Sequence, residues 1–148
     1  SKDDEANLVV WRGETCFVLL NLFPYNNGHC LIVPFRRVPA YTDLEPAEQV
    51  EIAATMDRVM RWLQRAFAPD GFNVGINQGE AAGAGIPDHL HVHVVPRWAS
   101  DTNFMPVTAG AKVIPEALQS TWAKLRAAAA AEAEATTQAE AETEQQAQ

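Results

Sequence analysis

The chain of 148 residues has little cysteine and no long apolar run. Its two cysteines, Cys16 and Cys30, stand apart in apolar segments, so we expect both thiols to be reduced and buried, as is usual in a cytoplasmic protein. No apolar segment approaches the roughly 20 residues that a membrane span needs. No signal peptide is recognisable near the charged N-terminus either. We therefore expect a cytoplasmic location and no membrane partner.

Positive charge is scarce outside the body of the chain. The net charge is −8, but residues 127–148 hold five glutamates without any Lys or Arg, and residues 2–5 contribute a further −2. Residues 6–126 are therefore close to neutral. This balance argues against a broad basic surface for a nucleic acid polymer, but it allows a small phosphate pocket.

The apolar fraction of 47% and the length predict one domain. Short apolar or alternating segments predict strands at residues 7–11, 15–21, 29–34, 71–77 and 89–95. Residues 46–67 predict the clearest helix, because Pro46 suits a first turn and six apolar residues follow at helical spacing. A second helix is expected over residues 115–131. This order predicts an α+β fold with an antiparallel sheet and two main helices.

Residues 127–148 differ from the rest because they contain only Ala, Glu, Gln and Thr. The Ala-rich start can extend the second helix, but from Ala135 onward no apolar face is available for burial. Ordering such a segment costs entropy that burial does not offset, so we expect a helical extension that frays to disorder. The predicted organisation is a domain over residues 1–126 and a tail over residues 127–148.

Three of the four histidines lie within residues 89–95, His-Leu-His-Val-His-Val-Val. Alternate side chains share one face of an extended strand, so His89, His91 and His93 are expected on one face, about 7 Å apart. Three alternatives follow: a surface strand without function, an open zinc site, or covalent phosphoryl chemistry by a neutral imidazole. The strict alternation, and the glycine-rich loop before it, favour an active site.

This run resembles the His-φ-His-φ-His-φ-φ motif of the histidine triad (HIT) proteins, a family of nucleotidyl hydrolases and transferases. Two further segments are similar to that family. Asn21 followed by Gly-His-Cys-Leu-Ile-Val-Pro at residues 28–34 resembles its nucleoside-binding strands, and residues 77–85 resemble its phosphate loop. Within the family, residues 93–104 most resemble the bacterial diadenosine tetraphosphate phosphorylases and hydrolases.

The resemblance implies a HIT-like domain that pairs as a homodimer and cleaves dinucleoside polyphosphates, with diadenosine tetraphosphate as the leading substrate. The resemblance implies a reaction through a covalent nucleotidyl-histidine intermediate, whose nucleotidyl group is then transferred to phosphate or water. An alternative is a nucleotide-binding regulatory protein with weak or vestigial catalysis. Turnover separates the two, because a binding protein releases no mononucleotides.

Catalytic roles carry over to four histidines. The resemblance makes His91 the nucleophile and gives His93 hydrogen bonds to the phosphate oxygens or the leaving oxygen. The backbone carbonyl of His89 is expected to bind the far nitrogen of His91 and so fix its tautomer. His29 is expected to add polar support from the neighbouring strand, or else to be a satisfied interior residue.

Substrate-binding roles carry over to side chains in two loops. Asn21 is implied to bind the ribose hydroxyls, with the alternative that it caps a turn. Phe23 is expected to line the adenine pocket or to pack in the core. Asn77 and Gln78 are amides that can donate to a phosphate, although one of them can be a turn residue.

The glycine loop and the end of the histidine strand complete the candidate site. Gly83 and Gly85 allow backbone amides to approach phosphate oxygens. Many family members have Ser or Gln at the position of Gly85, so the choice of acceptor depends on other groups. Arg97 is expected to attract a distal phosphate or to be an ion-paired surface residue. Trp98 is expected to contact a second base or a partner subunit, or simply to pack.

We expect no bound cofactor. Some relatives hold a structural zinc ion with an N-terminal Cys-x-x-Cys pair and a histidine, but this chain lacks the cysteine pair and has arginines at residues 36–37. A nucleophilic imidazole also needs a free lone pair, which a bound metal would occupy. Mg²⁺ is expected only with the polyphosphate substrate.

Overall fold

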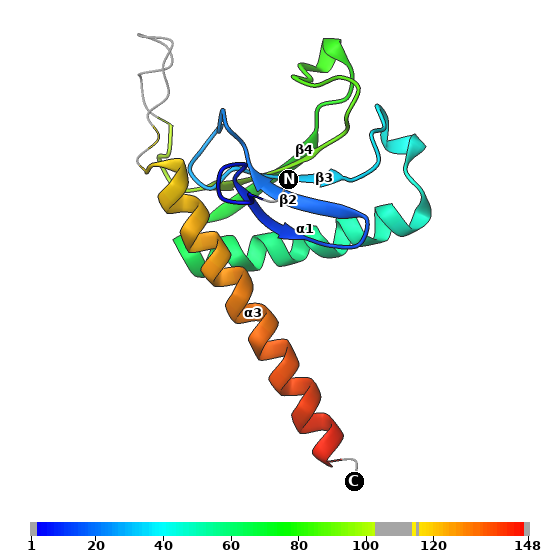
Figure 1. Ribbon diagram of the computed structural model, residues 1–148. Coiled ribbons are helices and arrows are strands. Elements are labelled where there is room, and N and C mark those ends of the chain that lie inside the picture. The colour runs from blue at the N-terminus through cyan, green and yellow to red at the C-terminus, as the bar shows by residue number, and fades with distance from the viewer. Residues whose placement is uncertain (1–2, 103–113, 115, 147–148) are drawn as a thin grey trace.

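The structure is a computed structural model that describes residues 3–102, 114 and 116–146. A five-stranded sheet with strand order β1-β2-β3-β5-β4 forms its centre, and every neighbouring pair is antiparallel (Figure 1). The strands are β1 (Val9–Arg12), β2 (Cys16–Leu20), β3 (Cys30–Pro34), β4 (Gly71–Ile76) and β5 (Val92–Arg97). The predicted antiparallel α+β fold is confirmed.

Helix α1 (Pro46–Phe67) lies along one face of the sheet and has the bounds expected from the sequence (Figure 1). Its apolar stripe buries Ile52, Val59 and Leu63 against the strands. Trp62, which the stripe did not include, is also buried, with only 1% of its surface exposed. Two short 3-10 helices lie in loops. The first, η1 (Tyr41–Asp43), precedes α1, and the second, η2 (Glu80–Ala82), follows β4.

Side chains of β2 and β3 alternate between the two faces of the sheet, as strand geometry requires. The face toward α1 carries the buried residues Cys16, Val18, Leu20, Cys30 and Ile32. The residues between them point to the opposite face and are only partly buried where they flank a pocket. The helix-covered face is therefore the core, and the other face is available for a ligand.

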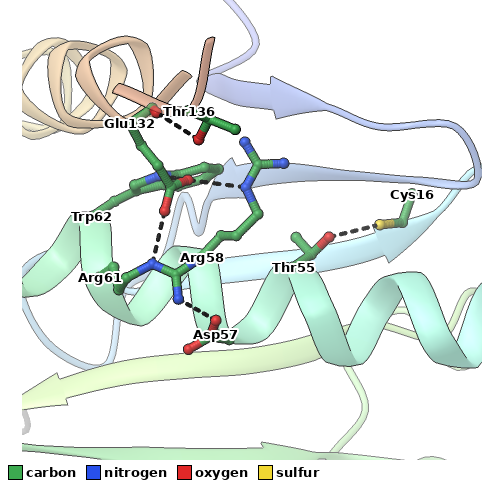
Figure 2. Close-up of polar contacts among 8 residues, drawn as sticks. All are labelled: Cys16, Thr55, Asp57, Arg58, Arg61, Trp62, Glu132 and Thr136. Carbon is green, nitrogen blue, oxygen red and sulfur yellow. Dashed lines mark hydrogen bonds and ion pairs between the residues drawn. The ribbon is translucent and has the colours of Figure 1, made fainter. Parts of the chain in front are cut away.

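Helix α3 (Leu118–Gln146) crosses α1, and its second half projects away from the domain (Figure 1). Leu125, Ala128 and Ala129 from its first half are buried in the core. One turn later the Glu132 carboxylate reaches the side of α1, where Trp62 and two arginines meet it (Figure 2).

This helix is longer than the helical extension expected from the sequence. It continues to Gln146, although its residues 133–145 are exposed. Ala, Glu and Gln have high helix propensity, so the backbone stays helical without an apolar face. The packed part of the chain also extends past residue 126, since Ala128, Ala129 and Glu132 all contact the domain. The expected start of this helix at residue 115 and the Asn-Phe pair at residues 103–104 lie outside the described residues.

Both cysteines are unpaired and buried, as expected from the sequence. Burial raises the pKa of Cys16 to about 11 and the pKa of Cys30 to about 12. Neither thiol is therefore ionised near neutral pH. Within the part of the chain that the structure describes, no helix has the length and apolar composition to cross a membrane.

Candidate active site

The histidine run enters the sheet later than the sequence predicts, because β5 begins at Val92. Before that residue, the N–H of Leu90 donates to the carbonyl of Val38 at 2.7 Å instead of to a neighbouring strand. All three histidines of the run nevertheless line one pocket. The predicted gathering of the imidazoles on one face is confirmed, although strand pairing covers only part of the run.

The pocket lies on the sheet face opposite the α1-packed core and has a volume of about 520 Å³, within the size range of small-molecule sites. Its apolar wall comes from the outward-facing residues of β2 and β3, namely Phe17, Leu19, Leu31 and Val33. Its remaining lining comes from the loops and the histidine run, namely Asn21, Phe23, Tyr25, Asn77, Gly83, Gly85, Ile86, His89, His91 and His93.

His91 is held in the tautomer that a nucleophile needs. Its Nδ1 lies 2.9 Å from the backbone carbonyl oxygen of His89. A carbonyl can only accept, so Nδ1 carries the proton and Nε2 keeps its lone pair. The ring also meets His93 edge-on, with the two centroids 4.9 Å apart. The carbonyl contact expected from the sequence is therefore present.

His29 and His93 form a chain of hydrogen bonds whose direction is set by the backbone. The N–H of Tyr25 donates to His29 Nδ1 at 3.0 Å, so this nitrogen carries no proton. His29 therefore carries its proton on Nε2, which donates to His93 Nδ1 at 2.9 Å. His93 must in turn carry its proton on Nε2. We call this pair of imidazoles the histidine relay.

The relay ends at His93 Nε2–H, a hydrogen-bond donor without an acceptor in the described structure. His93 Nε2 is buried and has no hydrogen-bond partner among the described residues. Burial lowers the pKa of His93, and the neighbouring His91 lowers it further, so the ring stays neutral near pH 7. A buried donor that lines a pocket is suited to an anionic oxygen of a ligand.

Two further residues expected at the site, His89 and Asn21, form hydrogen bonds with the backbone. His89 Nε2 donates to the carbonyl of Pro34 at 2.9 Å, which fixes the ring against the end of β3. Asn21 lines the pocket and also caps a turn, since its Oδ1 accepts from the N–H of Phe23 at 3.0 Å. Phe23 is not a core residue, because 79% of its surface is exposed beside the pocket.

The glycine loop contributes some of its expected residues and not others. Asn77 lines the pocket, and its Nδ2 donates to the Tyr25 hydroxyl oxygen at 3.4 Å. Gly83 and Gly85 also line it, and Gly83 has a φ of 80° that favours glycine. Gln78 is outside the lining, because its Oε1 accepts from the N–H of Tyr41 and so anchors the loop to η1.

Arg97 and Trp98 also lie outside the lining of this pocket. The Arg97 guanidinium donates to Asp101 at 2.6 and 2.8 Å and to Asn73 at 2.6 Å, and it holds the pKa of Asp101 well below its usual range. Trp98 Nε1 donates to the carbonyl of Phe67 at 3.4 Å. Of the two alternatives expected for Arg97, the structure shows the ion pair, with Asp101 as its partner.

Several lining residues of the pocket were not predicted from the sequence. The apolar wall was detectable in principle, because its residues alternate with the core residues of β2 and β3. Tyr25 carried no such signal. Its ring stacks on His93, with centroids 5.6 Å apart and planes 15° apart, and it lies 4.7 Å from the ring of His29. Only the folded loop before β3 brings this side chain to the site.

Several histidine nitrogens that could bind a zinc ion are engaged in hydrogen bonds. Among the described residues, no group of three or more His, Cys, Asp or Glu side chains is arranged to hold a metal ion. His91 Nδ1 binds a carbonyl, and His29 and His93 bind each other through one nitrogen each. These bonds direct the rings toward one another and toward the backbone instead of toward a common ion.

Comparison with known proteins places these features in a wider group. The family model for the HIT domain matches residues 2–100. A Mycobacterium tuberculosis protein named AP-4-A phosphorylase is 48% identical over 118 residues, which cover 80% of this chain and 60% of that protein. An asymmetrical bis(5'-nucleosyl)-tetraphosphatase of Schizosaccharomyces pombe is 34% identical over 101 residues, covering 68% of this chain and 55% of that protein. The chain thus spans little more than half the length of these relatives.

Solved structures share the fold. A zinc-bound histidine triad family protein from Mycobacterium smegmatis aligns with a TM-score of 0.71 and 27% identity, covering 87% of this chain and 88% of that one. The Caenorhabditis elegans NitFhit protein aligns with a TM-score of 0.66 and 27% identity, covering 83% of this chain and 27% of that one. The same sheet and helices therefore occur both alone and within a longer protein.

Proposed function

The chain belongs to the HIT domain family, and on that premise we propose that it cleaves dinucleoside polyphosphates through a covalent nucleotidyl intermediate on His91. The observation that carries the proposal is the pairing of two defined tautomers in one pocket. His91 has its lone pair on Nε2, and His93 has a donor without a partner on Nε2. The names of the relatives support diadenosine tetraphosphate as the substrate.

In the first step, His91 Nε2 attacks the α-phosphorus of the substrate. The bond from this phosphorus to the bridging oxygen breaks, and the oxygen leaves with the electron pair. With diadenosine tetraphosphate the leaving group is ATP, and an AMP unit stays on the imidazole. His93 Nε2–H donates a hydrogen bond to the oxygen that gains charge.

In the second step, an oxygen of inorganic phosphate attacks the same phosphorus. The bond to His91 Nε2 breaks, its electron pair returns to the ring, and ADP leaves. Water in the same role would release AMP. We propose phosphate as the acceptor, because the relative with 48% identity is named a phosphorylase.

For binding, we propose that the nucleoside base packs against the apolar wall formed by Phe17, Leu19 and Leu31, with Asn21 beside the ribose. The phosphates then lie between the histidines and the glycine loop, where backbone amides near Gly83 and Gly85 can donate. No cofactor is required, and Mg²⁺ accompanies only the polyphosphate.

We also propose a homodimer that acts in the cytoplasm. Strand β4 supports the dimer, because it lies at an edge of the sheet and Val74 is 42% exposed there. An edge strand offers unpaired backbone groups to a second copy. Sedimentation equilibrium of the protein, with and without Val74→Lys, tests this assembly.

The test of the activity is product analysis of diadenosine tetraphosphate with labelled inorganic phosphate. Phosphorolysis gives ATP and labelled ADP, and its rate rises with phosphate. Unlabelled AMP and ATP would identify water as the acceptor and contradict the phosphorylase proposal. Two unlabelled ADP molecules would contradict attack at the α-phosphorus. Binding without any product would favour the regulatory alternative.

A further inference from the structure

The pocket has no cationic wall for an anionic substrate, since none of the described residues that line it is Lys or Arg. Neutral donors must therefore make the hydrogen bonds to the phosphate oxygens. His93 Nε2–H is one of them. Asn21 is poorly placed to be another, because its Oδ1 accepts from Phe23 and its Nδ2 lies 3.4 Å from His29 Nδ1.

Tyr25 presents a second neutral donor in the same pocket. Its ring is stacked on His93, and its hydroxyl oxygen accepts a hydrogen bond from Asn77 Nδ2. A phenol that accepts through oxygen keeps its own proton available to donate. About half of the Tyr25 side chain is exposed, and the residue lines the pocket beside both His91 and His93.

We propose that the Tyr25 hydroxyl donates to a nonbridging oxygen of the attacked phosphate, which makes Tyr25 a further catalytic residue. The proposal rests on the proposed function, and no covalent bond forms or breaks at Tyr25. The stack on His93 and the bond from Asn77 hold the ring before substrate arrives, so the donor needs no reorganisation during the reaction. Together with His93, it compensates for the missing positive charge.

Removal of the hydroxyl group alone tests this role. Tyr25→Phe keeps the ring that stacks on His93, and we expect kcat/KM for diadenosine tetraphosphate to fall about tenfold or more, as for the loss of a hydrogen bond to a charged group. A fall of less than about twofold would overturn the proposal.

Gly85 allows a rescue experiment in the same pocket. A Cβ added at Gly85 meets no atom within 4 Å, and its φ lies outside the left-handed region, so a side chain fits there. Gly85→Ser in the Tyr25→Phe background supplies a new hydroxyl, and we expect at least about threefold recovery of kcat/KM. Gly85→Ala in the same background is the matched control and should recover nothing. Equal recovery by both variants, or by neither, would contradict a missing donor.

A binding measurement separates this proposal from the proposed function. Titration calorimetry with AMP and with adenosine should show AMP affinity falling about tenfold in Tyr25→Phe while adenosine affinity stays within about twofold. An equal loss of affinity for AMP and adenosine, or no loss for either, would overturn the proposed phosphate contact. If wild type binds AMP in this way but cleaves no dinucleoside polyphosphate, the proposed function is wrong and the Tyr25 contact stands.

Discussion

The histidine relay and a second polar group, the Glu132 cluster, are built into the same small domain in opposite ways. The Glu132 cluster comprises Glu132 and its partners Arg58, Arg61 and Trp62. The relay passes through neutral rings and ends at His93 Nε2–H, which has no partner among the described residues. The Glu132 carboxylate is charged and accepts from Arg58 at 3.0 Å, Arg61 at 2.8 Å and Trp62 at 2.9 Å (Figure 2). An incomplete set of hydrogen bonds marks a place for a ligand, whereas a complete one joins two helices.

Burial acts on both groups, and the neighbours decide the outcome. At His93, burial lowers the pKa and His91 lowers it further, so the neutral form is kept. At Glu132, burial raises the pKa, but hydrogen bonds from Arg61, Arg58 and Trp62 outweigh it, and the pKa lies below its usual value. Each group is thereby held in one protonation state near neutral pH, neutral for His93 and charged for Glu132.

The largest effect should come from His91, the proposed nucleophile beside the relay. His91→Asn removes the lone pair proposed to attack phosphorus, so we expect turnover of diadenosine tetraphosphate to fall by about three orders of magnitude or more. Calorimetry should find AMP affinity within a few-fold of wild type, because His91 contributes little of the binding. Residual activity above about a tenth of wild type would show that another group is the nucleophile. Glu134→Gln, on an exposed turn of α3, serves as the unaffected control.

The Glu132 cluster should respond in stability instead of in turnover. Glu132→Ala removes the acceptor of the Trp62 Nε1–H and of Arg58 Nε, and it leaves Arg61 with Asp57 alone. We therefore expect a loss of about 2 kcal/mol in the free energy of unfolding. Turnover measured well below the melting transition should stay unchanged. Urea unfolding measures this loss, and Glu134→Ala is the matched control. Because the Glu134 side chain is exposed, its removal should change the free energy of unfolding by less than about 0.5 kcal/mol. Equal stability of the two variants would show that the cluster does not hold the helices.

The two regions should also lose stability in different ranges of pH. The pKa of His93 is lowered in the folded state, so its contribution is complete above about pH 6.5 and is lost as the pH falls through the folded value. The pKa of Glu132 is also lowered, so its contribution is lost only below the ordinary carboxyl range near pH 4.5. Urea unfolding from pH 8 to pH 2 should show the first decrease in both wild type and Glu132→Gln.

The second decrease, at the acid end, should be smaller in Glu132→Gln than in wild type. Identical pH profiles for the two proteins would show that Glu132 is not the acid-sensitive group. A stability that stays constant between pH 7 and pH 5 in wild type would contradict a buried neutral His93.

The smallest effect should come from the projecting part of α3. A chain that ends at Glu134 loses residues 135–148, of which residues 135–145 are exposed. Within the described part of the chain, the lost segment reaches the cluster through the Thr136 hydroxyl, which donates to the Glu132 carbonyl at 3.0 Å. We expect the melting temperature to change by less than about 2 °C and turnover to stay the same. A larger loss of either would show that this segment docks on a second subunit.

Periodicity predicted the framework well. Pro46 and the apolar stripe set the bounds of α1, and alternation located the strands and gathered the histidines on one face. Such patterns report which face of an element is buried, but they do not report where a loop side chain meets a distant strand. Tyr25 therefore escaped prediction, since its place beside His93 depends on the loop that the neighbouring Asn26 ties to Asp101.

The alternatives that the sequence left open for Arg97 and Gln78 also depend on partners within the fold. Both side chains have the right chemistry for phosphate, but Arg97 pairs with Asp101 and Gln78 accepts from the N–H of Tyr41. Trp62 lies just outside the stripe that periodicity selected, yet α3 covers it and Glu132 binds its indole. Beyond Ala135 the helix continues to Gln146 without an apolar face, and the Ala, Glu and Gln residues there have high helix propensity.

Because both native thiols are buried, a single introduced cysteine can be labelled without labelling of Cys16 or Cys30. With pKa values of about 11 and 12, Cys16 and Cys30 stay protonated near neutral pH and should not react with maleimide or methanethiosulfonate probes while the domain is folded. Glu134→Cys would then present a single reactive sulfur on the outer turns of α3. A spin label there would report the separation of the two α3 helices across the proposed homodimer by electron resonance, without removal of either native cysteine.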